Sequence, residues 1–395
     1  MPTDAIALFI LLIIAAACGW AFARFGGGAK RSSKPAPLSA DYLKGVHFLL
    51  EDNPDKAIEV FVAMMEVDNE TVETHFALGS LFRRRGEVDR AIRIHQNLIA
   101  RPNLAKSYRD QALYALAEDY LRAGLLDRAE GLFEKLAGNS TRQAEATDKL
   151  VSIYELQNDW QQAISARRKL SGQAGNERVI AHYHCQLADE ALTRSDVAGA
   201  RAQLKAAQSM GTWLHRGAIM RASIALQNDD LKTARKLYTR VAEEDARFLL
   251  DIWSNMKRVL DGLRGDNNFE RFLDRLVQRT PSIAPWVTQV ALIHGDTDID
   301  LVRRGLLRWL DADATLREAL SAMALLPPAD TATDEQLSTL CAGLGVLLRR
   351  RANYLCESCG YLGEQLYWQC PGCRNWDSIR PHLTSNPDLF PSLSC

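Results

Sequence analysis

Hydrophobic residues recur every three or four positions through most of this chain, as they do on one face of an α-helix. From residue 39 onward such segments follow one another, separated by short polar turns. Four of them begin alike, with "DKAIEVF", "DRAIRIH", "DRAEGLF" and "QQAISAR". The pattern predicts an all-α architecture built from a repeated helical unit.

Small residues mark the repeat. Pairs of them stand twelve positions apart at Gly45/Ala57, Gly79/Ala91, Ala117/Ala129, Val151/Ala163, Ala188/Ala200 and Ala222/Ala234. The second members are separated by 34, 38, 34, 37 and 34 residues. A period of 34 is typical of tetratricopeptide repeats, in which each unit is a pair of antiparallel helices. Small side chains at both positions let the paired helices approach closely, and Gly86 and Gly124 suit turns with a positive φ.

Beyond residue 242 the repeat becomes irregular, although helical patterns continue. We interpret them as degenerate repeats, so that a tetratricopeptide-repeat solenoid occupies residues 40–350. A solenoid of this kind exposes a long concave surface, which we expect to capture a peptide or protein. The alternative is a spacer between two other modules. Five arginines between residues 83 and 93 are either a solvated face or a docking site for an acidic segment.

The N-terminal segment predicts a membrane anchor. Residues 5–23, "AIALFILLIIAAACGWAFA", carry no charge and as a helix would be about 28 Å long. Asp4 precedes the segment, whereas Arg24, Lys30, Arg31 and Lys34 follow it. The positive-inside rule then leaves the bulk of the chain in the cytoplasm. A cleaved signal peptide or a lipoprotein signal at Cys18 would need a basic start. We therefore expect an anchor at residues 1–25 and a linker at residues 26–39.

The sequence "CESCGYLGEQLYWQCPGC" predicts a metal site near the C-terminus. Cys356, Cys359, Cys370 and Cys373 form two Cys-x-x-Cys pairs with the spacing of a tetrathiolate site. Four thiolates hold zinc or a single iron ion, and they leave no coordination position open for catalysis. We expect a rubredoxin-like knuckle pair or two-stranded ribbon at residues 351–383, followed by a tail at residues 384–395. A module this small needs metal to fold.

Composition and motifs limit the classes of protein to which this chain can belong. The 395 residues carry a net charge of −1, which gives no electrostatic footprint for nucleic acid. No phosphate-binding glycine loop or H-E-x-x-H motif is present, and no catalytic set stands out. The "HYHC" run at residues 182–185 could offer ligands, but core packing is the better interpretation of Cys185. We therefore expect a protein without enzymatic activity.

Taken together, these parts resemble the lipopolysaccharide assembly protein B family of Gram-negative bacteria. The resemblance is carried most specifically by "DYLKGVHFLLEDNPDKAIEVF" (41–61), "LGSLFRRRGEVDRAIRIHQNLI" (78–99) and "YLCESCGYLGEQLYWQCPGCRNW" (354–376). The family's four metal-binding cysteines fall on Cys356, Cys359, Cys370 and Cys373. Arg374, which departs from the glycine of rubredoxin itself, suits this family.

The resemblance implies an inner-membrane regulator of lipopolysaccharide synthesis. It would promote proteolysis of the deacetylase LpxC by the membrane protease FtsH, and it would be linked to lipopolysaccharide assembly enzymes. We expect the metal module to fix the C-terminal end of the solenoid by packing against its repeats. Two alternatives stay open: a membrane electron carrier that uses iron, and a general chaperone for envelope assembly. Whether the chain forms a homodimer is also open.

Overall fold

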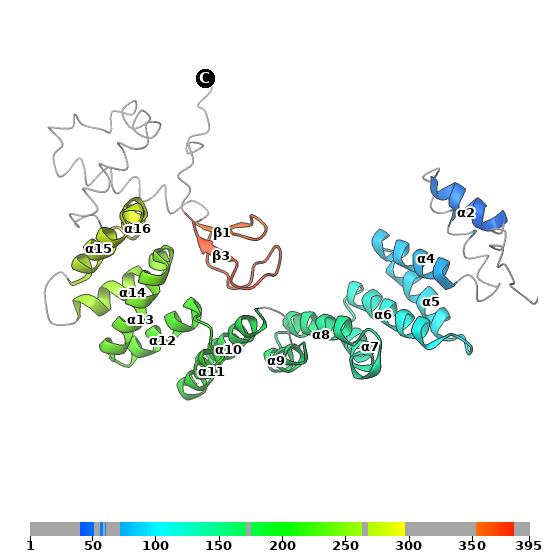
Figure 1. Ribbon diagram of the computed structural model, residues 1–395, viewed down its shortest axis with the longest axis horizontal. Coiled ribbons are helices and arrows are strands. Elements are labelled where there is room, and N and C mark those ends of the chain that lie inside the picture. The colour runs from blue at the N-terminus through cyan, green and yellow to red at the C-terminus, as the bar shows by residue number, and fades with distance from the viewer. Residues whose placement is uncertain are drawn as a thin grey trace, which may run out of the picture. The chain divides into compact units, whose positions relative to one another are not determined.

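The computed structural model describes residues 40–50, 56–57, 60, 72–170, 175–262, 268–296 and 353–382. The predicted anchor, linker and tail lie outside these ranges, as do the predicted repeats between residues 297 and 350. Among the described helices, none combines the length and the apolar character needed to cross a membrane. The chain divides into two compact units, Met1–Arg142 and Gln143–Cys395, each built of helix pairs (Figure 1).

The first unit contains two complete helix pairs. Its described helices are α2 (Ala40–Leu50), α4 (Val72–Arg85), α5 (Val88–Ile99), α6 (Lys106–Arg122) and α7 (Leu126–Asn139). Helix α4 packs on α5 and α6 packs on α7, with α5 against α6. Ala91, Ala117 and Ala129 are fully buried where the paired helices meet. The twelve-residue spacing therefore predicted these pairs correctly, because only a small side chain fits between such close helices.

A polar network joins three helices of the first unit. The buried ring of His95 on α5 lies against Gly79 on α4, and its Nδ1 is hydrogen-bonded to the carboxylate of Asp119 on α6. Arg83 completes the network, with its Nη1 2.8 Å from Asp119 Oδ1 and its Nη2 3.0 Å from Glu118 Oε2. One member of the five-arginine run thus points inward and holds α4 to α6.

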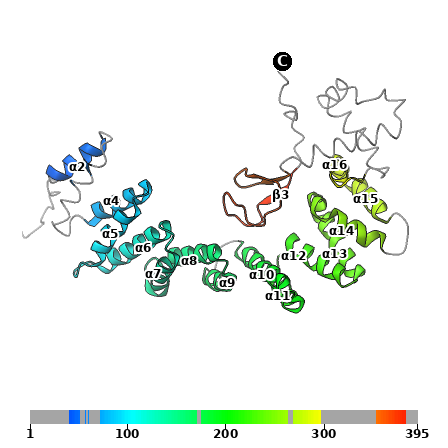
Figure 2. The same cartoon turned by 180° about the vertical axis from the view of Figure 1, so that it is seen from behind.

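The second unit continues the repeat. Its pairs are α8 (Gln143–Gln157) with α9 (Trp160–Lys169), α10 (Asn176–Thr193) with α11 (Val197–Ser209), and α12 (His215–Gln227) with α13 (Leu231–Glu244). After α13 come η3 (Ala246–Phe248), α14 (Leu249–Asp261), α15 (Asn268–Arg279), η4 (Pro281–Ile283) and α16 (Ala284–His294). The same helix pairs can be followed from behind in Figure 2.

The turn inside each helix pair uses one residue in the left-handed region. Gly86 and Gly124 have φ of 84° and 75°, as predicted. At the equivalent position of the next three pairs stand Asn158, Ser195 and Asp229, with φ of 58°, 61° and 56°. The residue after each of these three is an aspartate whose side chain caps the following helix. Sequence reasoning recognised only the glycines, although Asn and Asp also tolerate this conformation.

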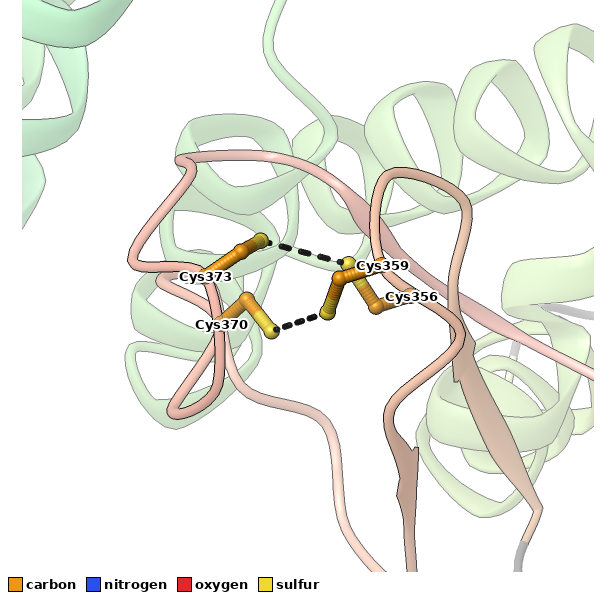
Figure 3. Close-up of side chains that lie close together, drawn as sticks. All are labelled: Cys356, Cys359, Cys370 and Cys373. Atoms are coloured by element: carbon orange, nitrogen blue, oxygen red, sulfur yellow. Dashed lines mark hydrogen bonds between the residues drawn. The ribbon is translucent and has the colours of Figure 1, made fainter. Parts of the chain in front are cut away.

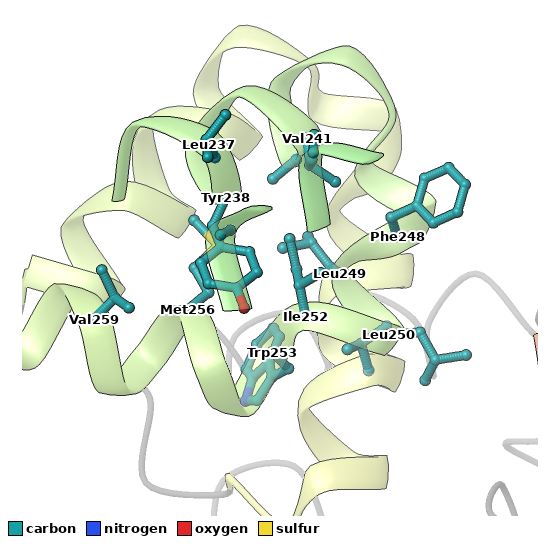
Figure 4. Close-up of a cluster of buried hydrophobic side chains, with 14 of the residues drawn as sticks. Leu237, Tyr238, Val241, Phe248, Leu249, Leu250, Ile252, Trp253, Met256 and Val259 are labelled. Carbon is teal, nitrogen blue, oxygen red and sulfur yellow. The ribbon is translucent and has the colours of Figure 1, made fainter. Parts of the chain in front are cut away.

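The largest core lies among helices α12 to α16. Trp253, Tyr238, Phe248 and Met256 are almost completely buried there (Figure 4). The same cluster includes Tyr354, three of the cysteines and other side chains of the C-terminal module. The module therefore packs on the solenoid, as expected from the sequence, and shares a hydrophobic core with it.

The C-terminal module is a small antiparallel sheet with two cysteine knuckles. Its strands are β1 (Tyr354–Cys356), β2 (Leu362–Gly363) and β3 (Ile379–Pro381), in the order β2-β1-β3. The expected two-stranded ribbon thus has a third strand. It forms because the chain returns after the second knuckle and pairs with β1, in the register Cys356 to Ile379.

The contact between Gly79 and His95 predicts a sharp difference between two glycine substitutions. A Cβ on Gly79 would lie 2.4 Å from His95 Nε2, and the network around Asp119 prevents the ring from moving away. We expect Gly79→Ala to destabilise α4 and α5 by about 2 kcal/mol. Gly131→Ala in α7 meets nothing within 4 Å and should stabilise its helix by about 0.5–1 kcal/mol. Amide hydrogen exchange of the two pairs measures both effects. Unchanged exchange in α4 for Gly79→Ala would contradict the packing.

Candidate metal centre and its seat on the solenoid

The two knuckles bring the four predicted cysteines together. Their Sγ atoms all lie within 4.8 Å of one another. The Sγ atoms of Cys356 and Cys373 are 3.7 Å apart, as are those of Cys359 and Cys370 (Figure 3). A tetrahedral site with metal–sulfur bonds of about 2.3 Å has sulfur–sulfur edges of about 3.8 Å. The thiols therefore fit one tetrathiolate ion, and the donor set suits zinc and iron alike.

The backbone of the two knuckles is built in the same way. Gly360 and Arg374 follow the second cysteine of each pair, and both have a positive φ, 76° and 60°. Their amides donate to the carbonyls of Cys356 and Cys370, at 2.9 and 2.8 Å. Arg374 thus adopts the conformation for which rubredoxin-type knuckles use glycine, at a cost of about 1 kcal/mol. The departure from glycine leaves the fold of the knuckle unchanged.

The sulfur atoms differ in their surroundings. Cys356 and Cys370 are buried, Cys373 is half-buried and Cys359 is exposed. Although desolvation by burial raises the pKa of Cys356, its hydrogen bond with the Ser378 side chain and those with the Ser358 and Cys359 backbone lower it to about 6. Such donors favour the thiolate, which is the form that binds metal. The first knuckle leaves one side of the site open to solvent at Cys359.

A seat for this ribbon is formed by helices far away in the sequence, and Trp376 lies at its centre. Its ring packs on Trp160 of α9 and on His182 and Tyr183 of α10, with centroids 5.4 to 6.0 Å apart. Its indole Nε1 donates to Glu155 Oε1 of α8 at 2.9 Å. The indole therefore ties the knuckle to three helices at once.

Asp377 provides the ionic part of the seat. Only 3% of its side chain is exposed, and its Oδ2 accepts from Arg178 Nε at 2.7 Å while Oδ1 accepts from Arg380 Nη1 at 3.0 Å. Burial alone would raise the pKa of Asp377, but His182 and the guanidinium groups of Arg380 and Arg178 hold it well below its usual range. The carboxylate is therefore ionised at any physiological pH.

The other edge of the ribbon contacts η3 and α14. Trp368 stacks on Phe248 of η3 with centroids 5.8 Å apart. Tyr354 of β1 donates its hydroxyl to Asp251 Oδ1 of α14 at 2.7 Å. Burial raises the pKa of Asp251 to about 6. Hence the ribbon lies across α8, α9, α10, η3 and α14 and covers part of the surface that these elements present.

The "HYHC" run at residues 182–185, for which core packing is the preferred interpretation, is buried. Cys185 is fully buried among small residues of α10 to α12, and burial raises its pKa to about 11. His182 is also fully buried, but it faces the ribbon. The four knuckle cysteines form the only group of potential metal ligands in the described parts of the chain. Sequence reasoning missed the seat residues, although two tryptophans in so short a module could have signalled a docking face.

Removing two of the thiols should release both the metal and the ribbon. In the Cys356→Ser, Cys359→Ser variant, a tetrahedral site loses half its donors, so we expect metal content to fall from one ion per chain to near zero. Tryptophan fluorescence should then change, because Trp368 and Trp376 leave the seat. Elemental analysis measures the first effect. Cys185→Ala is the control and should keep its metal. A full complement of metal in the double variant would refute the ligand assignment.

Neutralising Asp377 should weaken the seat without disturbing the knuckle. Asp377 has φ of 53°, which asparagine also tolerates, so Asp377→Asn removes the charge alone. We expect the ribbon to be destabilised by about 2 kcal/mol, since Arg178 and Arg380 lose their partner.

The pH dependence follows from the lowered pKa of Asp377. A carboxylate whose pKa is depressed in the folded protein contributes stability that is fully present above the unfolded pKa of about 3.9. This contribution is lost only as the pH falls toward the folded pKa. The difference between wild type and Asp377→Asn should therefore stay constant from about pH 8 to pH 5. Thermal release of the ribbon, followed by tryptophan fluorescence, measures it. A difference that shrinks within this range would contradict the paired carboxylate.

Two family models match parts of this chain, one in the ribbon and one in the repeats. Residues 354–381 match the family model described as "Rubredoxin metal binding domain", and residues 74–110 match a tetratricopeptide repeat model. Among solved structures, the C-terminal part of a repeat-containing protein from Cytophaga hutchinsonii aligns with a TM-score of 0.36 at 13% identity, over 60% of this chain and 95% of that one.

Two curated relatives cover nearly the whole chain. Lipopolysaccharide assembly protein B of Escherichia coli is 32% identical over 378 residues, which is 95% of this chain and 97% of that protein. The protein of the same name from Haemophilus influenzae is 31% identical over 401 residues, with the same coverage. At this identity and coverage, this chain belongs to the lipopolysaccharide assembly protein B family.

Proposed function

We propose that this protein is an adaptor, anchored in the inner membrane with its bulk in the cytoplasm, that regulates lipopolysaccharide biosynthesis. In this role it promotes FtsH-dependent proteolysis of the LpxC deacetylase and links lipopolysaccharide assembly enzymes. The family and the repeat fold indicate a non-enzymatic adaptor. The observation that carries the proposal is the ribbon seated across five elements of the solenoid, α8, α9, α10, η3 and α14, on the basis of which the metal module is part of the scaffold.

The metal centre has a structural role in this proposal. Cys356, Cys359, Cys370 and Cys373 would hold one iron or zinc ion, and its four thiolate bonds would supply the folding energy that so small a sheet lacks. All four donors come from the protein, so no position remains for a substrate or a water molecule. Folding of the knuckles in turn places Trp368, Trp376 and Asp377 for their contacts with the helices.

Tethering would provide the regulatory effect. A single anchor at residues 1–25 would confine the solenoid to the membrane surface, where FtsH also acts. The effective concentration of a client bound by the solenoid is then raised beside the protease, without any new contact between the two. The repeats supply surfaces for both partners, and the ribbon keeps the C-terminal part of the solenoid in one conformation.

The half-life of LpxC tests the proposal. In cells depleted of this protein we expect LpxC to persist, and expression of the wild type should restore its turnover. The Cys356→Ser, Cys359→Ser variant should fail to restore turnover although it is produced, whereas Cys185→Ala should succeed. An LpxC half-life that does not change on depletion would refute the adaptor role. Turnover restored by the cysteine variant would show that the metal centre is dispensable for it.

A further inference from the structure

The second helices of the last pairs carry more basic than acidic residues. Helix α11 has two basic residues and no acidic one, α13 has four basic and two acidic residues, and α15 has three basic and two acidic residues. The whole chain, in contrast, has a net charge of −1. Each of these three helices is therefore net basic, and none of them supplies one of the contacts with the ribbon described above.

Two hollows lie on either side of α13. The larger has a volume of about 690 Å³ and lies among α13, α14 and α15, with Arg235, Arg271 and Arg275 on its rim. Its floor consists of the buried side chains of Leu260, Phe272 and Leu276.

The smaller hollow, of about 480 Å³, lies among α11, α12 and α13. Arg201, Lys205 and Arg221 line its rim, and its floor consists of Leu204, Ile224 and Leu237. Acidic side chains also line the hollows, Glu243 and Asp274 in the larger and Asp230 in the smaller, but basic ones outnumber them in each. Each hollow thus combines an apolar floor with a net basic rim, and α13 contributes to both.

The rim cations of the larger hollow are available to a ligand. Arg235 and Arg271 are exposed, and within the described ranges their side chains form no hydrogen bond or ion pair. Arg275 donates only to a backbone carbonyl of its own helix. Arg279 faces Glu243 at 3.4 Å, but both side chains are largely solvated. The arginines of this hollow therefore make few interactions with other described residues and can pair with the carboxylates of a ligand.

We infer that the two hollows beside α13 form one docking surface for an acidic amphipathic segment of a partner protein. Its carboxylates would pair with the arginines of the rim, for which their forked geometry is suited, and its apolar side chains would reach the floors. A planar lipid surface would meet the protruding rim but would leave the recessed floors unused. An acidic peptide explains both features, so the geometry favours it.

The inference deepens the proposed adaptor role, on which it rests, by adding a partner site away from the ribbon. The ribbon contacts α8, α9, α10, η3 and α14, whereas the rims belong to α11, α12, α13 and α15. A partner in the hollows can therefore be held while the ribbon stays seated. The site does not require that the partner be LpxC or FtsH, so it can be tested apart from LpxC turnover.

The test uses full-length protein in detergent and a fluorescein-labelled synthetic peptide. The probe is an amphipathic peptide of glutamate and leucine of about 18 residues, or five helical turns. We expect Arg235→Glu with Arg271→Glu to weaken binding about tenfold or more, because two rim charges become repulsive. Arg168→Glu with Lys169→Glu in α9 reverses two exposed charges outside the hollows, and we expect it to change the Kd less than about twofold. If both variants weaken peptide binding equally, the peptide is held by nonspecific electrostatic attraction to basic residues. That result would overturn the inference.

Two altered peptides test the chemistry of the segment. A peptide with glutamine for glutamate should lose binding because the rim then has no opposite charge. A peptide with serine for leucine should bind about tenfold more weakly, because nothing fills the floors. If the serine peptide binds as well as the parent peptide, or if the parent does not bind, the docking surface is refuted.

Vesicles distinguish the peptide from a lipid surface. Co-sedimentation with phosphatidylcholine vesicles containing about 30% phosphatidylglycerol is compared for the rim variant and the α9 variant. We expect the two variants to sediment equally. If the rim variant alone loses vesicle binding while its peptide binding is unchanged, the surface is a membrane-docking face and the inference fails.

Discussion

The buried carboxylate of Asp377 fixes the position of the ribbon on the solenoid. A charge with 3% of its side chain exposed is stable only where cations meet it, and here these come from α10 and from β3. Arg178 lies 199 residues before Asp377 in the chain, so the pair joins parts of the molecule that no local preference brings together. Any shift of the ribbon across the helices would separate Asp377 from Arg178 and leave it only Arg380 of the ribbon itself, and this penalty favours a single docked arrangement.

Metal site and seat depend on each other through the second knuckle. The chain leaves Cys373, passes through the left-handed Arg374 and places Trp376 and Asp377 on the helices within four residues. A sheet of three short strands has almost no core of its own, so the knuckle keeps this shape only when its thiols are held together. The solenoid in turn covers indole and carboxylate groups that an isolated ribbon would expose. Loss of either part removes the support of the other.

The ribbon also changes which surfaces of the repeats can bind a partner. First helices of helix pairs are the expected recognition surface of such a solenoid, but part of this surface is covered by Trp368, Trp376 and their neighbours. Among the described residues, the ribbon does not contact the second helices α11, α13 and α15, which carry most of the basic side chains beside α13. Within these residues, the metal module and the basic hollows therefore use different elements of the solenoid.

The sequence by itself determined the helix pairs, because a helix crossing needs small side chains at fixed spacing. Gly79, Ala91, Ala117 and Ala129 satisfy this need within single repeats. It also determined the four thiols, since two Cys-x-x-Cys knuckles are local structures that carry their ligands with them. The positive-φ glycines of the first turns were likewise visible, whereas Asn158, Ser195 and Asp229 were not, because residues of these types are also common elsewhere.

Only the tertiary structure decided where the ribbon lies and what it contacts. Glu155, Arg178 and His182 show no sign in the sequence that they face a module near residue 370, since each also suits an ordinary repeat helix. The basic hollows could not be predicted from the sequence for the same reason. Their arginines come from separate helices, and each arginine taken alone looks like a solvated charge. Local spacing fixes elements and knuckles because neighbours along the chain make those contacts. The seat of the ribbon and the hollows beside α13 depend on how several helices stack on one another, which no short segment encodes.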